Sequence, residues 1–297
     1  MPSRLNRRAL LAIVATLTML VACQSNAVTA SQPDPTAANK VLVTDLFNKL
    51  LYDADTSVID KYVSPTYRQH NPRLADGPAG LRALLESRRA QNPQPRQIAN
   101  RVVAQGDLVV VWSDYQRTPG VSFWNIADTF RVANDKLVEH WDVIEPVPAT
   151  TASGNDLYST LSVARDGPSD PRPSTAGSQE VVQGLLEGLR QRHDPSTVDR
   201  YIATDLYQHD PVLPNGAAAV RRAYETDRAV NPNSMVSSVQ VVAQDDYVTI
   251  RYHYQPTPTA LGKAVAEAFR VRDGRIVEHW ITSQDVPAAS ANTNTMF

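Results

Sequence analysis

The sequence predicts two tandem units of the α+β class. The 297-residue chain repeats itself, because Tyr62 and Tyr201 are 139 residues apart (201 − 62) and many other pairs share this offset. About 40 identities lie in the 118 aligned positions of residues 41–158 (repeat 1) and 180–297 (repeat 2). In each repeat, apolar residues at helical spacing come first and strand-like stretches come last. Helices followed by a run of strands indicate an α+β unit.

The first half of each repeat is expected to form three helices. Apolar residues at helical spacing predict the first one, from Val41 in repeat 1 and from Val181 in repeat 2. An aspartate precedes a short second helix and caps its free N–H groups. A glycine precedes the third helix, and Asn-Pro ends it. These residues are Asp55 and Asp194, Gly77 and Gly216, Asn92-Pro93 and Asn231-Pro232.

The second half of each repeat is expected to form four antiparallel strands joined by hairpins. Turn-forming pairs such as Asn134-Asp135 and Asp273-Gly274 separate the stretches. The expected strands are 97–104, 107–117, 122–133 and 136–146, and then 236–243, 246–256, 261–272 and 275–285. A curved sheet wrapped on helices leaves a pocket between the two layers.

The N-terminal segment has the features of an export signal. Residues 1–22 combine a basic start with an apolar run that is too short to span a bilayer. Leu20-Val21-Ala22-Cys23 resembles a bacterial lipobox, which implies cleavage before Cys23 and lipidation of its sulfur. Acyl chains would hold the protein on a membrane of the cell envelope, facing the periplasm or the outside. Gln24 resembles the sorting signal for the outer membrane in a host that has two membranes.

Linker-type sequences separate the predicted parts of the chain. Residues 23–38 are expected to form a flexible tether, followed by a first domain over 39–158. The Pro- and Asp-rich residues 159–179 are expected to link it to a second domain over 180–297. A linker of this length reaches across one domain. Together with the face-to-face pairing of sheets that the family resemblance described below implies, this predicts that the two domains pack as an intramolecular pseudo-dimer with approximate two-fold symmetry.

Composition excludes several classes of function. Net charge is −2 with 29 basic and 31 acidic residues, so no basic surface for nucleic acid is expected. The single cysteine excludes an internal disulfide and a cysteine-based zinc site. The histidines are scattered, so no metal site is expected.

Several short motifs recur in similar form and in the same order in both repeats. In repeat 1 they are Gln69-His70-Asn71-Pro72, Asp76-Gly77, Val103-Ala104-Gln105-Gly106-Asp107, Asp128-Thr129-Phe130-Arg131 and Glu139-His140-Trp141-Asp142. These motifs resemble those of the SnoaL-like polyketide cyclase family, in its branch of predicted aldol-condensation enzymes within the nuclear transport factor two-like superfamily. The resemblance implies a cone-shaped barrel with a deep apolar pocket, no metal or organic cofactor, and aldol chemistry that uses an Asp to move a proton.

Strand alternation selects three candidate catalytic residues in repeat 1. His140 and Asp142 share one face of the last strand, and Asp128 lies on an otherwise apolar face of the strand before it. If these faces line the pocket, Asp128 is a candidate general base, because apolar surroundings raise the pKa of a carboxyl. The alternative is a structural ion pair between Asp128 and Arg131 or Arg101. The expected companions on the two faces are Val138, Ile144, Phe130 and Val132.

Further polar residues are candidates for substrate binding, with structural roles as the alternative. His70 and His209 either lie at the pocket mouth or fix a loop by binding backbone groups. Repeat 2 has Glu267 in place of Asp128 and Ile281 in place of Asp142, so it is expected to be the weaker catalyst. The candidate substrate-binding residues are His70, Trp112, Asp114, His209, Arg251, His253, Glu267 and His279.

Three classes of function remain open from the sequence. The first is an enzyme of the aldol-condensation, cyclase or isomerase type that acts on a small, mostly apolar carbonyl compound. The second is a non-catalytic ligand-binding protein of the envelope, and the third is a protein-interaction module. A buried Asp128 that faces an enclosed pocket without an arginine partner favours the enzyme.

Overall fold

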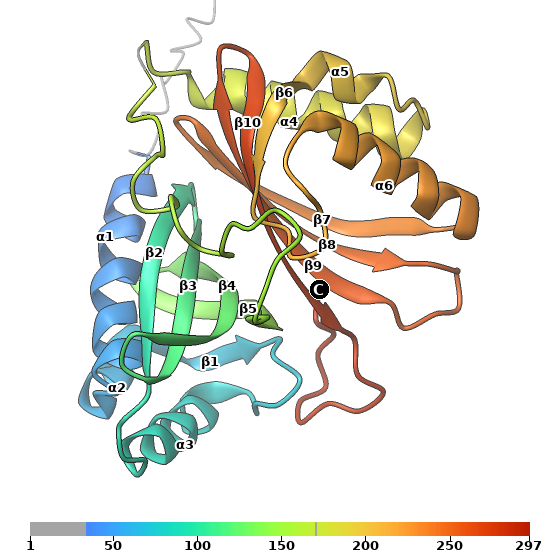
Figure 1. Cartoon of the computed structure of the whole chain (residues 1–297). Coiled ribbons are helices and arrows are strands. Elements are labelled where there is room, and N and C mark those ends of the chain that lie inside the picture. Colours follow the sequence, from blue (N-terminus) through green and yellow to red (C-terminus); the bar gives the residue numbers. More distant parts are fainter. Residues whose placement is uncertain (1–33, 170) are drawn as a thin grey trace, which may run out of the picture. The chain divides into compact units, whose positions relative to one another are not determined.

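The structure is a computed structural model that describes residues 34–169 and 171–297 (Figure 1). The predicted signal peptide, Cys23 and most of the predicted tether lie outside the described residues. Among the residues described, no helix is long and apolar enough to cross a membrane.

Repeat 1 has three helical regions and a five-stranded sheet, which confirms the predicted fold class. The first helix continues into a π-helical turn over Asn48–Tyr52. A short 3-10 turn begins at Thr56, where the Asp55 carboxylate accepts a hydrogen bond from the Ser57 backbone N–H at 2.9 Å. The elements are α1 (Thr36–Phe47), α2 (Ile59–Tyr62), β1 (Val63–Gln69), α3 (Gly77–Arg89), β2 (Arg96–Gln105), β3 (Leu108–Thr118), β4 (Val121–Ala133) and β5 (Lys136–Pro146).

Repeat 2 has the same order of elements. Its π-helical turn spans Glu187–Gln191, and the Asp194 carboxylate accepts a hydrogen bond from the Ser196 backbone N–H at 2.9 Å. In Figure 1 the helices of each repeat lie beside the sheet of that repeat. The elements are α4 (Thr175–Leu186), α5 (Thr197–Tyr201), β6 (Ile202–Gln208), α6 (Ala217–Val230), β7 (Met235–Gln244), β8 (Tyr247–Gln255), β9 (Lys263–Arg272) and β10 (Arg275–Asp285).

The two sheets have strand orders β1-β5-β4-β3-β2 and β6-β10-β9-β8-β7. The four hairpin-linked strands of each sheet were predicted, but β1 and β6 were not. Each of these pairs in parallel with the last strand of its sheet, β1 with β5 and β6 with β10. At the β4–β5 turn, Asn134 and Asp135 both have positive φ, as expected for a tight two-residue hairpin.

Each repeat buries its own apolar core between sheet and helices. In repeat 1, Leu46 and Leu50 of the first helical region pack with Val111 of β3 and Phe130 of β4. A third cluster contains residues from both sheets, including Trp112 and Val143 of repeat 1 and Trp280 of repeat 2. These side chains point away from the helices of their own repeat, since strand alternation sends neighbouring residues to opposite faces.

The segments that follow the two sheets bind reciprocally to loops of the other repeat. In the first, the Ala152 backbone N–H donates to the Pro211 carbonyl at 2.9 Å, and the Asn155 amide donates to the Gln208 carbonyl at 2.8 Å. The equivalent contacts, 139 residues away, join Ala291 to Pro72 at 2.7 Å and Asn294 to Gln69 at 2.8 Å. Residues 147–161 and 286–297 are called the C-terminal segments of repeats 1 and 2 below.

Candidate functional site

Repeat 1 encloses a cavity of about 160 Å³ between its helices and its sheet. Its walls are mainly apolar, with Leu46, Leu50 and Ile126 among them. A few polar side chains converge on this apolar space, an arrangement typical of small-molecule sites. The polar lining residues are Gln69, Asn71, Arg73, Arg88, Gln97, Asp128, His140 and Asp142.

Asp128 and His140 form a buried hydrogen-bonded pair in this cavity. His140 Nε2 lies 3.0 Å from Asp128 Oδ1, and the Gln97 amide donates to Asp128 Oδ2 at 2.7 Å. Gln69 Oε1 accepts a hydrogen bond from a backbone N–H, so this atom is an oxygen and His140 Nδ1, 2.9 Å away, must donate to it. A proton therefore lies on the remaining contact, shared between the imidazole and the carboxyl.

The sequence alternative of an ion pair between Asp128 and an arginine is wrong. Arg131 binds Asp107 and Glu139, and Arg101 Nε donates to the Leu161 carbonyl. Within the described part of the chain no arginine lies within 4.0 Å of an Asp128 oxygen, and Asp128 is only 3% exposed.

Asp142 adds a second carboxyl group to the cavity. The Asn71 amide donates to Asp142 Oδ2 at 2.6 Å, whereas Oδ1 is buried and has no hydrogen-bond partner among the described residues. Burial raises the pKa of Asp142, and the charge of nearby Asp128 adds to this effect, although His140 opposes it. A neutral Asp142 can donate a hydrogen bond to a carbonyl oxygen in the cavity.

The three predicted catalytic residues therefore meet, with ligand atoms of Asp128, His140 and Asp142 within 4.8 Å of one another. Such a set could also bind a metal ion, which the scattered histidines of the sequence did not suggest. The 3.0 Å contact between His140 Nε2 and Asp128 Oδ1 has hydrogen-bond length, so these two atoms are already bound to each other.

The structure corrects one detail of strand alternation. Arg131 pairs with Glu139 and Val132 pairs with Leu137, so Val138 is the extra residue of a bulge in β5. Leu137 rather than Val138 therefore lines the cavity together with His140 and Asp142.

Four predicted substrate-binding residues lie on the opposite face of their strands, away from the cavity. Trp112 of β3 belongs to the cluster between the sheets, and Asp114 accepts hydrogen bonds from Asn100, Gln116 and Ser122. Because side chains alternate along β3, Val109 and Val111 lie on the other face of the strand, in the core of repeat 1. In repeat 2, Arg251 donates to the Met296 carbonyl at 2.9 Å, and His253 stacks on Phe297 at 4.1 Å.

The two loop histidines have structural contacts rather than a place in the cavity. His70 Nδ1 donates to the Thr295 carbonyl at 2.5 Å, Nε2 lies 2.9 Å from Glu139, and the ring stacks on Trp141. His209 has the equivalent contacts with Asp156, Glu278 and Trp280. These contacts fit the alternative in which His70 and His209 fix a loop by binding backbone groups.

Repeat 2 retains an acid-base pair, Glu267 and His279, but both oxygens of its carboxyl are already hydrogen-bonded. His279 Nε2 lies 2.8 Å from Glu267, and the Tyr252 hydroxyl donates to the other oxygen of Glu267 at 2.5 Å. Burial works against the charge of Glu267, yet the hydrogen bonds from His279 and Tyr252 leave its pKa lowered. Ile281 takes the place of Asp142 opposite Glu267. The nearby carboxyl of repeat 2 is instead Asp210, at the position of Asn71; burial raises its pKa, His279 opposes this effect, and the charge of Glu267 adds to it.

The positioning groups Gln69, Asn71 and Gln97 were missed as site residues. A signal existed for Gln69, because it is repeated as Gln208 and both glutamines accept the Nδ1–H of the histidine on the neighbouring strand. Gln97 had no such signal, since Val236 replaces it in repeat 2.

Comparison with known proteins agrees with this architecture. Residues 180–291 match the family model described as SnoaL-like polyketide cyclase, and residues 43–140 match the model described as SnoaL-like domain. No curated protein matches the chain.

The chain is also similar to several solved structures, each over about the length of one repeat. IdmH from Streptomyces antibioticus is 25% identical over 36% of this chain and 91% of its own, with a TM-score of 0.32. TsrD from Streptomyces laurentii is 20% identical over 36% and 89%, with a TM-score of 0.32. AclR from Streptomyces galilaeus is 21% identical over 38% and 81%, with a TM-score of 0.33.

Proposed function

We propose that the first of the two SnoaL-like domains in this chain, repeat 1, moves a proton next to a carbonyl group in a small, mostly apolar molecule. This is the elementary step of aldol condensation, cyclisation and isomerisation. The observation that carries the proposal is the convergence of Asp128, His140 and Asp142 in one enclosed apolar cavity.

Each of the three residues has a separate role in this step. With the shared proton on His140, Asp128 is a carboxylate and accepts the proton from the carbon beside the carbonyl. The electron pair of the broken C–H bond moves into the carbonyl group, and negative charge develops on its oxygen. Asp142 donates a hydrogen bond to that oxygen from its neutral form, which burial favours by raising the pKa of this carboxyl. The resulting enolate then attacks a second carbonyl or regains a proton at another carbon.

A proton-exchange assay tests the function before the natural substrate is known. The full chain is incubated in D₂O with a panel of β-keto esters and cyclohexenones, and loss of the α-proton signal is followed by NMR. We expect at least one member of the panel to exchange faster than in buffer alone. Compounds that bind to the protein without faster exchange would favour the alternative, a non-catalytic binding protein.

We further propose that the protein is exported and held at the cell envelope by lipidation of Cys23. The lipobox-like residues 20–23 support this proposal, and so does the polar composition of residues 24–38, which suits a tether. Cys23→Ser is expected to abolish labelling with a fatty-acid analogue and to release the protein from membranes, because the tether has no membrane affinity of its own. Full membrane association of the Cys23→Ser protein would contradict the anchor.

The two repeats are also proposed to pack as an intramolecular pseudo-dimer in solution. The reciprocal contacts of the two C-terminal segments support it, because equivalent residues bind equivalent loops in both directions. The mixed core cluster that contains Trp112 and Trp280 supports it as well.

Glu145 of β5 reports on this packing. Burial raises the pKa of Glu145 to about 7, and the charge of Asp210 in repeat 2 contributes to the shift. One of its oxygens, Oε2, is buried and has no partner in the described ranges. If the repeats moved independently, water would reach the carboxyl and its pKa would return toward the ordinary value.

A further inference from the structure

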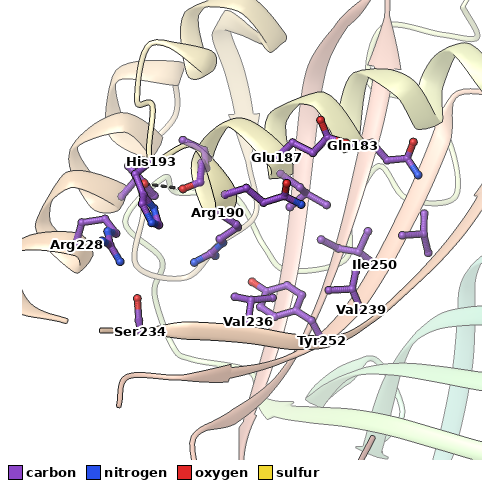
Figure 2. A pocket seen from close by; sticks show the side chains of 15 residues that line it. Gln183, Glu187, Arg190, His193, Arg228, Ser234, Val236, Val239, Ile250 and Tyr252 are labelled. Carbon is purple, nitrogen blue, oxygen red and sulfur yellow. Dashed lines mark hydrogen bonds between the residues drawn. The ribbon is translucent and has the colours of Figure 1, made fainter. Parts of the chain in front are cut away.

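Repeat 2 contains a larger cavity than repeat 1, and the cavity lies in a different place. Its volume is about 400 Å³, and residues of α4, the π-helical turn Glu187–Gln191, α6, β7 and β8 line it (Figure 2). Neither Glu267 nor His279 is among the lining residues.

Two local changes relative to repeat 1 account for this position. Tyr252 stands where repeat 1 has Ser113, and its hydroxyl bond to Glu267 makes the ring a wall between the cavity and the acid-base pair. Strand pairing is interrupted at the same place in both repeats, between Ala99 and Arg101 in β2 and between Ser237 and Gln240 in β7. Among these described residues only Ser238 of repeat 2 has a positive φ. The neighbouring Val239 lines the cavity and is 52% exposed, so this irregularity forms part of its rim.

The lining contains two arginines that form no ion pair at contact distance. Burial opposes the charge of Arg190, yet nearby Tyr252, Glu267 and Asp227 leave its pKa raised, and its guanidinium lies 5.7 Å from the centroid of the Tyr252 ring. Within the described residues no carboxylate lies within 4.0 Å of the guanidinium of Arg190 or of Arg228. Arg190 replaces Leu51 of repeat 1, so this charge is specific to repeat 2.

The nearby carboxylates are engaged by other groups. Glu187 lies 3.6 Å from Arg192, and Asp227 accepts hydrogen bonds from the Tyr254 hydroxyl at 2.5 Å and from Asn231. Glu267 is bound by Tyr252 and His279, as described above. The guanidinium donors of the two arginines therefore remain the charged groups best placed to bind a ligand.

The two arginines lie toward one end of the cavity. In Figure 2, Arg190 and Arg228 extend toward the end where Ser234 lies, whereas Val239 and Ile250 lie toward the other end together with Gln183. Guanidinium groups bind carboxylates with two parallel hydrogen bonds, and apolar walls favour a hydrocarbon body. We propose that repeat 2 is a binding domain for a carboxylate with an apolar chain, held at its charged end by Arg190 and Arg228. This inference does not depend on catalysis by repeat 1.

Calorimetric titration of the full chain with octanoate, and with octan-1-ol as the uncharged analogue, tests the proposal. We expect one octanoate per chain and tighter binding of octanoate than of octan-1-ol. Arg190→Leu, which introduces the residue of repeat 1, is expected to weaken octanoate binding at least 10-fold and to change octan-1-ol binding less than two-fold. Arg200→Leu is the matched control, because Arg200 is exposed on α5 and does not line the cavity.

Arg228→Gln provides a second, independent variant should Arg190→Leu fail to fold. It is expected to weaken octanoate binding several-fold. Equal affinity of the wild-type protein for octanoate and octan-1-ol would overturn the proposal. The proposal would also be overturned if the folded Arg190→Leu and Arg228→Gln variants bound octanoate as tightly as the wild type. The two arginines would then have a structural role only.

Discussion

Asp128→Asn should lower the rate of α-proton exchange by repeat 1 about 100-fold or more, within the range that general bases contribute. The amide has the shape of the carboxylate and can still accept the hydrogen bond of His140, but it cannot take up a proton at neutral pH. Ligand affinity should change little, whereas thermal stability should fall somewhat because the amide NH₂ group cannot accept the hydrogen bond that Gln97 donates to Asp128. NMR exchange rates and calorimetric titration of the same compound, measured on the same protein, separate these quantities.

Glu267→Gln is the matched control in repeat 2. Its carboxylate is already bound by Tyr252 and His279 and is separated from the cavity, so this substitution should leave the exchange rate almost unchanged. A rate loss in Glu267→Gln as large as in Asp128→Asn would show that the difference drawn between the repeats is wrong. An Asp128→Asn protein with the wild-type rate would remove Asp128 as the base.

Glu145→Gln should stabilise the protein at pH 8 by about 2 to 3 kcal/mol and have little effect near pH 4. The pKa of Glu145 is raised from 4.5 to about 7, so the folded protein disfavours its charged form. Stability from the neutral carboxyl is fully present below the unfolded-state pKa and is lost as the pH rises toward 7. The glutamine variant does not titrate and keeps this stability at pH 8. Urea unfolding of both proteins at pH 4, 6 and 8 measures the difference.

Asp285→Asn controls for changes in overall charge. Asp285 pairs with Lys263 on the surface and its side chain is 83% exposed, so the pH dependence of this variant should follow the wild type. If Glu145→Gln and the wild type differ by the same amount at every pH, Glu145 titrates normally. That outcome would contradict the proposed pseudo-dimer, because the buried surroundings of Glu145 would then be absent in solution.

The parts of the fold that depend on local sequence could be predicted. The hairpin strands follow from alternation and from turn residues such as Asn134 and Asp135, which adopt the positive φ that such turns need. Asp128, His140 and Asp142 were placed on the correct face because their strands are regular where these residues lie.

The parts that depend on distant partners could not be predicted. Strand β1 contains Pro65 and several exposed side chains, and it becomes a strand by pairing in parallel with β5, about 70 residues later. Pro65 is tolerated because β1 is an edge strand. The expectation that Trp112 binds substrate is not met, for a different reason: alternation separates the two faces of a strand but does not tell which of them meets the helices and which meets another sheet.

The C-terminal segments make each repeat depend on the other part of the chain for the contacts of one loop. Repeat 2 binds Ala152 and Asn155, which precede it in the chain. Repeat 1 binds Ala291, which follows its partner Pro72 by 219 residues (291 − 72) and lies beyond the whole of the second sheet. A chain cut just before residue 286 would therefore keep both sheets and the loop contacts of repeat 2, but it would leave the Pro72 loop of repeat 1 without its partner. The repeat that contains the three converging acid-base residues is thus the one whose loop contacts are sensitive to truncation at the far end of repeat 2.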